Sequence, residues 1–168
     1  MSLISLDAAP LIYLSKADSA DPADADDRLR GRKVRRLLES ADQEGDVVTI
    51  PSVALAEYLA GDRLPDSVFE QVYIETASVY VVLELSAEAA KIAAKIWRKG
   101  VKPLAQPAGG RQSLKADIYI CASAIAHKVS KIITNDPHFI ELLKGSEVEV
   151  VIVDKLPMDL VDALTGKD

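Results

Sequence analysis

The sequence predicts an α/β protein: a three-layer α/β/α sandwich with a parallel sheet of four to five strands. Short apolar segments alternate with segments of helical pattern along the chain. The apolar segments lack a clear apolar/polar alternation, which is typical of parallel strands covered on both faces. The chain has 168 residues, is 49% hydrophobic and shows no internal repeat, so we expect a single domain over residues 1–168.

Five apolar runs are predicted as strands, each bounded by turn residues or by a helical pattern. In chain order they are residues 2–7, 46–50, 78–85, 131–135 and 148–153. A helical segment separates each run from the next, as parallel strands require.

The segments between these strands are predicted as helices: residues 9–16, 26–45, 51–61, 64–77, 86–100, 115–127 and 136–145. Pro51 and Gly61 bound one of them, which is the preferred placing of proline at a helix start and glycine at a helix end. Gly45 is expected to end the helix before it. Ser86 is the expected N-cap of the helix that follows the third strand.

Two segments are expected to be loops. Residues 17–27 form an Asp-rich insertion that we expect to be a solvated loop leading into a helix. Residues 101–112 contain two prolines and two glycines, which favours a loop.

Composition and charge restrict the class of protein. The single cysteine, Cys121, cannot form an internal disulfide, which favours a reducing compartment. No run approaches the ~20 apolar residues of a membrane span, and Asp7 interrupts the apolar start, unlike a signal peptide. We therefore expect a soluble, cytoplasmic protein. A net charge of −6 argues against a broad basic face that grips nucleic acid, but not against acids gathered at a metal site.

Four acids come from separate segments, each near a strand end or a helix start: Asp7, Glu57, Asp117 and Asp136. Parallel α/β sheets place their sites where loops leave the carboxyl ends of the strands. Carboxylates that converge there repel one another unless a cation lies between them. Oxygen donors without a histidine or cysteine cluster suit Mg²⁺ or Mn²⁺ better than Zn²⁺.

Each acid taken alone has another interpretation. Asp7 suits a helix N-cap at a strand-to-helix turn, and Asp136 before Pro137 suits capping as well. Asp117, expected in the first turn or so of its helix, could favour the positive end of the helix dipole. Glu57 could be a half-exposed helix acid. The metal-site hypothesis depends on the four occurring together.

Four segments occur in this order: "LDAAPLIYL", "PSVALAEYLAG", "KADIYICASAIAH" and "ITNDPHF". With them the chain resembles the PIN-domain nucleases, especially the toxin ribonucleases of VapBC toxin–antitoxin systems, from residue 3 to about residue 153. The resemblance implies that the four acids bind metal and that Thr134 and Asn135 provide polar support in the same pocket. It also implies cleavage of RNA to a 5′-phosphate and a 3′-hydroxyl, an antitoxin partner and a homodimer.

Two departures from the family pattern weaken the support around the acids. Ala8 and Ala9 stand where the family often has a hydroxyl or amide, and His138 stands where an acid is common. Loss of such neighbours can lower metal affinity without removing the ligands. The alternative function is therefore a PIN-like binding or scaffold module with weak or no catalytic activity.

Three cations in or near the loop before the acid-bearing helix are candidate phosphate contacts: Lys102, Arg111 and Lys115. The basic run at residues 30–36 has three interpretations: a solvated helix face, an RNA contact or a seat for an acidic partner. His127 and His138 are not spaced as a ligand pair, and we assign them no catalytic role.

Overall fold

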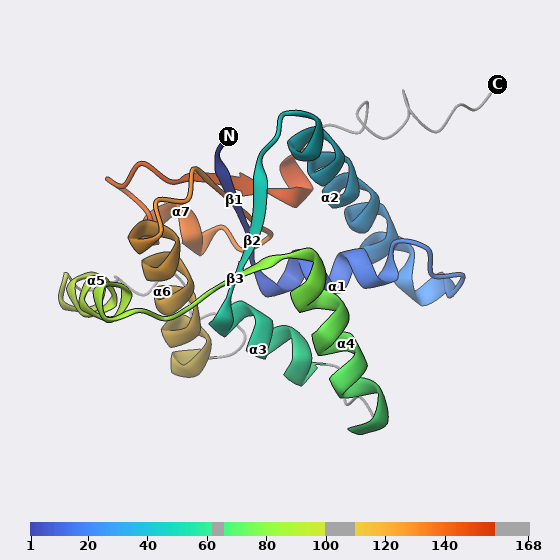
Figure 1. Ribbon diagram of the computed structural model, residues 1–168, viewed down its shortest axis with the longest axis horizontal. Coiled ribbons are helices and arrows are strands. Elements are labelled where there is room, and N and C mark those ends of the chain that lie inside the picture. The colour runs from blue at the N-terminus through green and yellow to red at the C-terminus, as the bar shows by residue number, and fades with distance from the viewer. Residues whose placement is uncertain (62–65, 100–109, 157–168) are drawn as a thin grey trace.

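The computed structural model describes residues 1–61, 66–99 and 110–156, and of these the side chains of 66–70 and 110–113 are not described. All strands of its five-stranded sheet are parallel, in the order β3-β2-β1-β4-β5 (Figure 1). The strands are β1 (Leu3–Leu6), β2 (Val47–Pro51), β3 (Val81–Leu83), β4 (Lys131–Thr134) and β5 (Glu149–Ile152). The predicted parallel sheet is confirmed.

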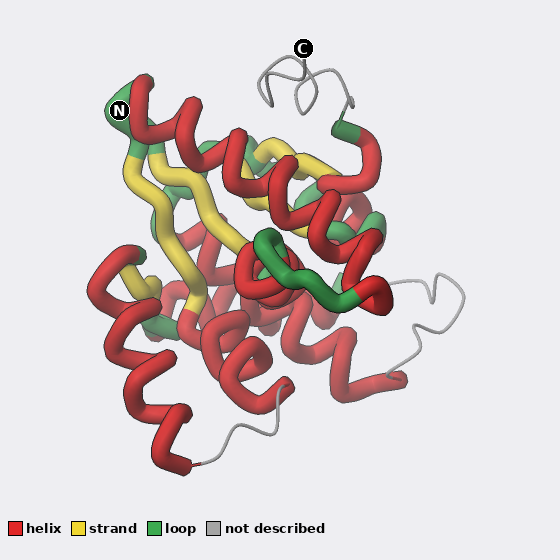
Figure 2. The backbone as a smooth tube through the Cα atoms, turned by 90° about the vertical axis from the view of Figure 1, so that its right-hand side faces the viewer, coloured by secondary structure: helices red, strands yellow, loops and turns green. Residues whose placement is uncertain are grey.

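Helices cover the sheet on two sides. They are α1 (Ala8–Lys16), α2 (Ala25–Gln43), α3 (Ser52–Gly61), α4 (Asp66–Val79), α5 (Ala87–Arg98), α6 (Gly110–Ala126) and α7 (His138–Leu142), with short 3₁₀ turns η1 (Pro22–Asp24) and η2 (Val153–Lys155). In Figure 1, α5, α6 and α7 lie to one side of the strands and α1, α2 and α4 to the other. In the view turned by 90°, α2 runs across the strands (Figure 2). No helix in the described part of the chain has the length and apolar character needed to cross a bilayer.

The core lies between the sheet and these helices. Leu6, Ile50 and Ile132 from the three central strands are fully buried. Ile120 of α6 and Phe139 of α7 are fully buried in the same cluster. Burial of both faces of the sheet explains why its strands are continuous apolar runs.

The strand order reverses at β1, and this reversal positions the site. The chain runs outward from β1 through β2 to β3, and then crosses to β4 on the opposite side of β1. Right-handed crossovers in the two directions place their helices on opposite faces. The loops after β1 and β4 therefore separate, and ligand sites of α/β sheets lie at such points.

Several boundaries differ from the prediction, most clearly at β3 and at the start of α6. The strand expected at 78–85 is only Val81–Leu83, because just these residues pair with β2 at the sheet edge, and α4 continues to Val79. The helix expected from residue 115 begins at Gly110, so the last three residues of the predicted 101–112 loop are its first turn. Glycine is tolerated at a helix start because it costs less there than in the interior. Residues 101–109 of that predicted loop lie outside the described residues.

The Asp-rich insertion at residues 17–27 is mostly exposed and leads into a helix, and part of it has regular structure. It contains the 3₁₀ turn η1, and residues 25–27 already belong to α2. Lys16 at the end of α1 lies 3.1 Å from Asp24 and 3.0 Å from Asp27. Arg35 of α2 pairs with Asp18 at 2.7 Å. The acids thus fasten the connection between α1 and α2, where they pair with cations of both helices.

The α1–α2 contact depends on Gly31, in the middle of α2. A Cβ atom there would lie 2.1 Å from the carbonyl oxygen of Tyr13 and 2.9 Å from the Cβ of Ala17. We expect Gly31→Ala to lower the free energy of unfolding by about 1–3 kcal/mol, because the helices must separate. Chemical denaturation followed by circular dichroism measures this change.

Gly61, at the end of α3, is the matched control, because no atom of the described residues lies within 4 Å of a Cβ built there. Gly61→Ala should change the free energy of unfolding by less than about 1 kcal/mol, the ordinary helix preference for alanine. Equal effects of the two substitutions would contradict the close α1–α2 approach.

Candidate active site

Asp7 follows β1 directly and is the N-cap of α1. Its Oδ1 accepts a hydrogen bond from the backbone N–H of Ala8 at 2.7 Å, and its Oδ2 accepts one from the Thr134 hydroxyl at 2.7 Å. The side chain is buried, with 7% exposure. Burial raises the pKa of Asp7, the two hydrogen bonds oppose this shift, and the charge of Asp136 adds to it. The capping interpretation of Asp7 therefore holds, and the same carboxylate also faces another acid.

Thr134, fully buried at the end of β4, connects two of the acids. Its hydroxyl donates to Asp7 and accepts from the backbone N–H of Asp136 at 3.0 Å. Asp136 Oδ1 in turn accepts the backbone N–H of His138 at 2.8 Å, and it lies 3.0 Å from Nδ1 of the same residue. Asp136 therefore also orders the turn into α7, as the capping interpretation expected.

Asp117 lies deeper in its helix than the sequence suggested. It is seven residues after Gly110, about two turns into α6, and not in the first turn. Because the helix dipole acts within the first turn, the dipole interpretation fails. The side chain is 7% exposed, and its Oδ2 has no hydrogen-bond partner among the described residues.

The other acids act on Asp117 through their charge. Burial, then the charges of Asp136, Asp7 and Glu57, raise the pKa of Asp117 to about 7. Cys121, one turn further along α6, is buried, and its pKa is raised by burial and by the charges of Asp117, Asp7 and Asp136. Acids from the ends of β1 and β4 and from α3 thus lie within electrostatic reach of Asp117 on α6, and we call these four acids the acidic pocket.

Glu57 of α3 is the most exposed of the four acids. Its residue is exposed, unlike Asp7 and Asp117. Partial burial of the carboxylate, and then the charge of Asp7, raise the pKa of Glu57. The half-exposed helix acid of the alternative interpretation is therefore also within electrostatic reach of the buried acids.

Asn135 is placed differently from Thr134 and Asp136. Its Nδ2 donates to Asp154 at 3.0 Å and to the Tyr13 hydroxyl at 3.3 Å, and its Oδ1 accepts the backbone N–H of Asp154 at 3.0 Å. Arg30 completes the network through Asp154 at 2.7 Å and stacks over the Tyr13 ring at 5.4 Å. Asn135 therefore makes its hydrogen bonds to Tyr13 and Asp154, outside the group of four acids, and its support of the neighbouring Asp136 is indirect.

Sequence reasoning did not predict the contacts of three residues: His138, Asp154 and Arg30. His138 contacts Asp136, and its position two residues later in "NDPHF" was the available signal. Asp154 closely follows the last strand, so the rule of strand ends could have found it. Arg30 lies 124 residues from Asp154, and nothing in the sequence pattern joins them.

The candidate phosphate contacts are only partly described. Lys115 is exposed on α6. Lys102 lies outside the described residues, and so does the side chain of Arg111. In the basic run at 30–36, the three arginines at positions 30, 35 and 36 all form ion pairs within the chain.

The pocket has suitable donors for a divalent cation but not a preformed shell. In residues 1–61, 66–99 and 110–156, no three acid, histidine or cysteine side chains already have the arrangement of a metal site. The unpartnered buried Oδ2 of Asp117 and its raised pKa nevertheless show a local excess of negative charge. A hard cation would relieve this excess, and carboxylate oxygens are its preferred ligands.

Several solved structures have the same fold. VapBC2 from Rickettsia felis bound to a DNA fragment from their promoter has a TM-score of 0.61 and 15% identity, over 89% of this chain and 98% of that chain. DNA-bound VapBC from Salmonella typhimurium has a TM-score of 0.57 and 18% identity, over 89% of this chain and 98% of that chain. FitAcB from Neisseria gonorrhoeae has a TM-score of 0.56 and 22% identity, over 91% of this chain and 99% of that chain.

No curated protein matches the chain. Comparison with protein families matches residues 10–144 to the family described as PIN domain, whose members are generally nucleases that use divalent metal ions. This match includes Glu57, Asp117 and Asp136, and it spans most of the described fold. The chain belongs to the PIN domain family.

Proposed function

We propose that this protein is a metal-dependent endoribonuclease and the toxin of a type II toxin–antitoxin pair. The observation that supports this most directly is the Asp117 carboxylate, which is buried, lacks a partner for Oδ2 in the described part of the chain and is acted on by three further acids. Burying an uncompensated carboxylate costs several kcal/mol. A bound divalent cation removes that cost, which is why we assign the pocket to metal binding.

Asp7, Asp117 and Asp136 are the residues to which we assign Mg²⁺, with Mn²⁺ as the alternative ion, and Glu57 completes the set. When bound, the ion offsets the charge of the scissile phosphate and lowers the pKa of a coordinated water. Both oxygens of Asp7 accept hydrogen bonds already, but a carboxylate oxygen has a second lone pair for a metal.

The chain's own residues hold the carboxylates in place, orient the attacking water and accept its proton. Thr134 fixes Asp7 and the backbone of Asp136 together, so these two carboxylates are held in place before RNA binds. We assign to Glu57 the orientation of the attacking water and the acceptance of its proton, because its carboxylate is exposed and its raised pKa makes it a better base. The proposed products carry a 5′-phosphate and a 3′-hydroxyl.

An antitoxin, a homodimer and a cytoplasmic location complete the proposal. The similar structures of VapBC, which contain toxin and antitoxin together, support a protein partner. Two segments are candidates for these contacts, residues 10–14 and 65–77. In the first, Pro10 and Leu11 of α1 are buried and belong to the core. In α4, Tyr73 and Ile74 are exposed at 42% and 62%, which supports a contact there.

A PIN-like binding or scaffold module is the second candidate. His138 contacts Asp136 Oδ1 with both its backbone N–H and its ring, at the position where the family often has an acid. A side chain that occupies this oxygen leaves less room for a metal. Titration with Mn²⁺ followed by thermal unfolding separates the candidates, because an ion that binds the folded state raises the melting temperature.

We expect Asp117→Asn to lower the rate of RNA cleavage by about 100-fold or more, because metal-assisted charge stabilisation contributes several kcal/mol. The measurement is cleavage of 5′-labelled single-stranded RNA in Mg²⁺, with EDTA abolishing it. Asp42→Asn is the matched control, because Asp42 is exposed at the far end of α2. Cleavage by Asp117→Asn at the native rate would remove Asp117 from the mechanism.

Without metal, we expect Asp117 to make stability depend on pH. Its pKa is about 7 in the folded protein, against an ordinary value of 3.8, so the folded state binds more protons between these values. The free energy of unfolding should therefore fall as pH rises from about 4 to 7, by up to about 1.4 kcal/mol per pH unit. Above pH 7 this group adds no further slope.

Denaturation in EDTA at several pH values checks this, with Asp117→Asn as the reference because it lacks the titrating group. The difference in unfolding free energy between native protein and variant should grow from pH 5 to pH 7 in favour of the variant. Mn²⁺ should reverse the loss in the native protein only. A difference that stays constant across this range would contradict the buried, unpaired carboxylate.

A further inference from the structure

A groove of about 500 Å³ lies between α5 and α6, away from the acidic pocket. Its floor consists of small and apolar side chains, with aromatic rings and cations around it. The lining residues are Ala90, Ala93, Ala94, Trp97, Arg98, Lys115, Ile118 and Tyr119. None of them has a role in the mechanism proposed above.

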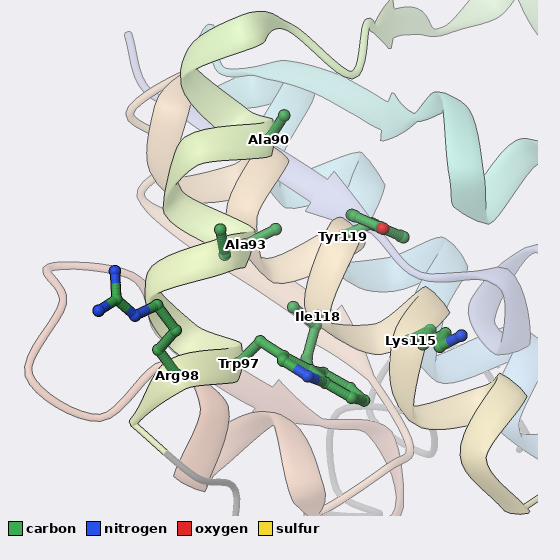
Figure 3. A pocket seen from close by; sticks show the side chains of 8 residues that line it. Ala90, Ala93, Trp97, Arg98, Lys115, Ile118 and Tyr119 are labelled. Atoms are coloured by element: carbon green, nitrogen blue, oxygen red, sulfur yellow. The ribbon is translucent and has the colours of Figure 1, made fainter.

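Two large aromatic side chains in this groove are open to solvent. Trp97 of α5 is 47% exposed, and Tyr119 of α6 is 39% exposed. In Figure 3 the Trp97 indole extends from α5 towards α6, beside Ile118, and the Tyr119 ring lies further along the same groove. Exposed rings over an apolar floor form a surface on which flat groups can stack.

The groove is also basic, although the chain carries a net charge of −6. Two exposed cations line it, Arg98 and Lys115, and neither forms an ion pair with another described residue. The arginines at positions 30, 35 and 36 differ, because their charges are matched by acids of the chain. Positive charge without an acidic partner among the described residues therefore lies at this groove.

We propose that the α5–α6 groove binds a segment of single-stranded RNA, with bases stacked on Trp97 and Tyr119 and phosphates held by Arg98 and Lys115. This inference rests on the proposed function in taking RNA as the ligand. Aromatic platforms bordered by cations are typical of single-strand binding. A protein partner is the weaker alternative, because lysine is depleted in protein–protein interfaces.

The groove and the acidic pocket share α6. Lys115 and Tyr119 are each two residues from Asp117, which places them on the opposite side of the helix at 100° per residue. The burial of Asp117 and the exposure of its two neighbours agree with this. An RNA chain that occupies both places must pass around α6, so the groove holds nucleotides distant from the cleaved bond.

Binding of a fluorescent 20-nucleotide single-stranded RNA to the full chain in EDTA tests the inference, because no cleavage interferes. Trp97→Leu should lower affinity by about five- to a hundredfold, the loss expected for one stacked base. Lys115→Gln should reduce the slope of log affinity against log salt by about 0.7, the loss of one phosphate contact. Val81→Ala is the control, because Val81 is similarly exposed at 53% but lies on β3, and the affinity of this variant should equal that of the native protein.

Native affinity and salt slope in both groove variants would overturn the inference. A second result would also overturn it: the native protein sediments as a dimer, Trp97→Leu sediments as a monomer, and RNA affinity is unchanged. The groove would then be a contact between copies of this chain. If the native protein does not cleave RNA in Mg²⁺ but Trp97→Leu still weakens RNA binding, the nuclease proposal fails and the groove remains. If cleavage is present but binding does not depend on Trp97 and Lys115, the groove fails and the nuclease remains.

Discussion

The pairing of β1 with β4 at the centre of the sheet is the constraint on which the acidic pocket depends. Leu6 lies opposite Ile133, and the backbone N–H of Asp7 donates to the carbonyl of Ile133 at 3.0 Å. This register brings Thr134 to Asp7, where its hydroxyl reaches Oδ2 at 2.7 Å. A slip of one residue would turn every side chain of β1 to the other face of the sheet, and the contact would be lost.

Three consecutive residues at the end of β4 are placed differently. Thr134 donates a hydrogen bond to Asp7 and the charge of Asp136 acts on Asp7, whereas Asn135, at the bend after the strand, donates to Asp154. Both atoms of the Asn135 amide are used there, and Arg30 holds Asp154 from α2. The loop that carries Asp136 is therefore fixed from two sides, by a hydroxyl within the pocket and by an ion-paired network behind it.

Sequence alone could predict the parallel sheet from its apolar runs. It could also predict that Asp7 and Asp136 are neighbours, because each acid directly follows one of these runs. It could not give the depth of Asp117, because prolines and glycines suggested a loop up to residue 112, whereas α6 begins at Gly110. The partners of Asn135 were not predictable, since Arg30 and Asp154 meet only in the folded chain. Likewise, helical periodicity marks Trp97 as part of an amphipathic helix but cannot show that nothing described covers it.

Net charge is a poor guide to the partners of this protein, because the charge is distributed by pairing. Acids of the insertion and of α2 neutralise the cations of α1 and α2, for example in the pairs Lys16–Asp27 and Arg36–Glu39. Among the described residues, the buried Asp117 has no partner for Oδ2, and neither Arg98 of α5 nor Lys115 of α6 forms an ion pair, whereas Lys91 of α5 pairs with Glu88. An anionic polymer would be repelled by the buried acids unless a metal were bound, and attracted by these two cations in any case. Asp117 and Lys115 lie on opposite sides of one helix, α6, which would let an acidic protein hold RNA as proposed.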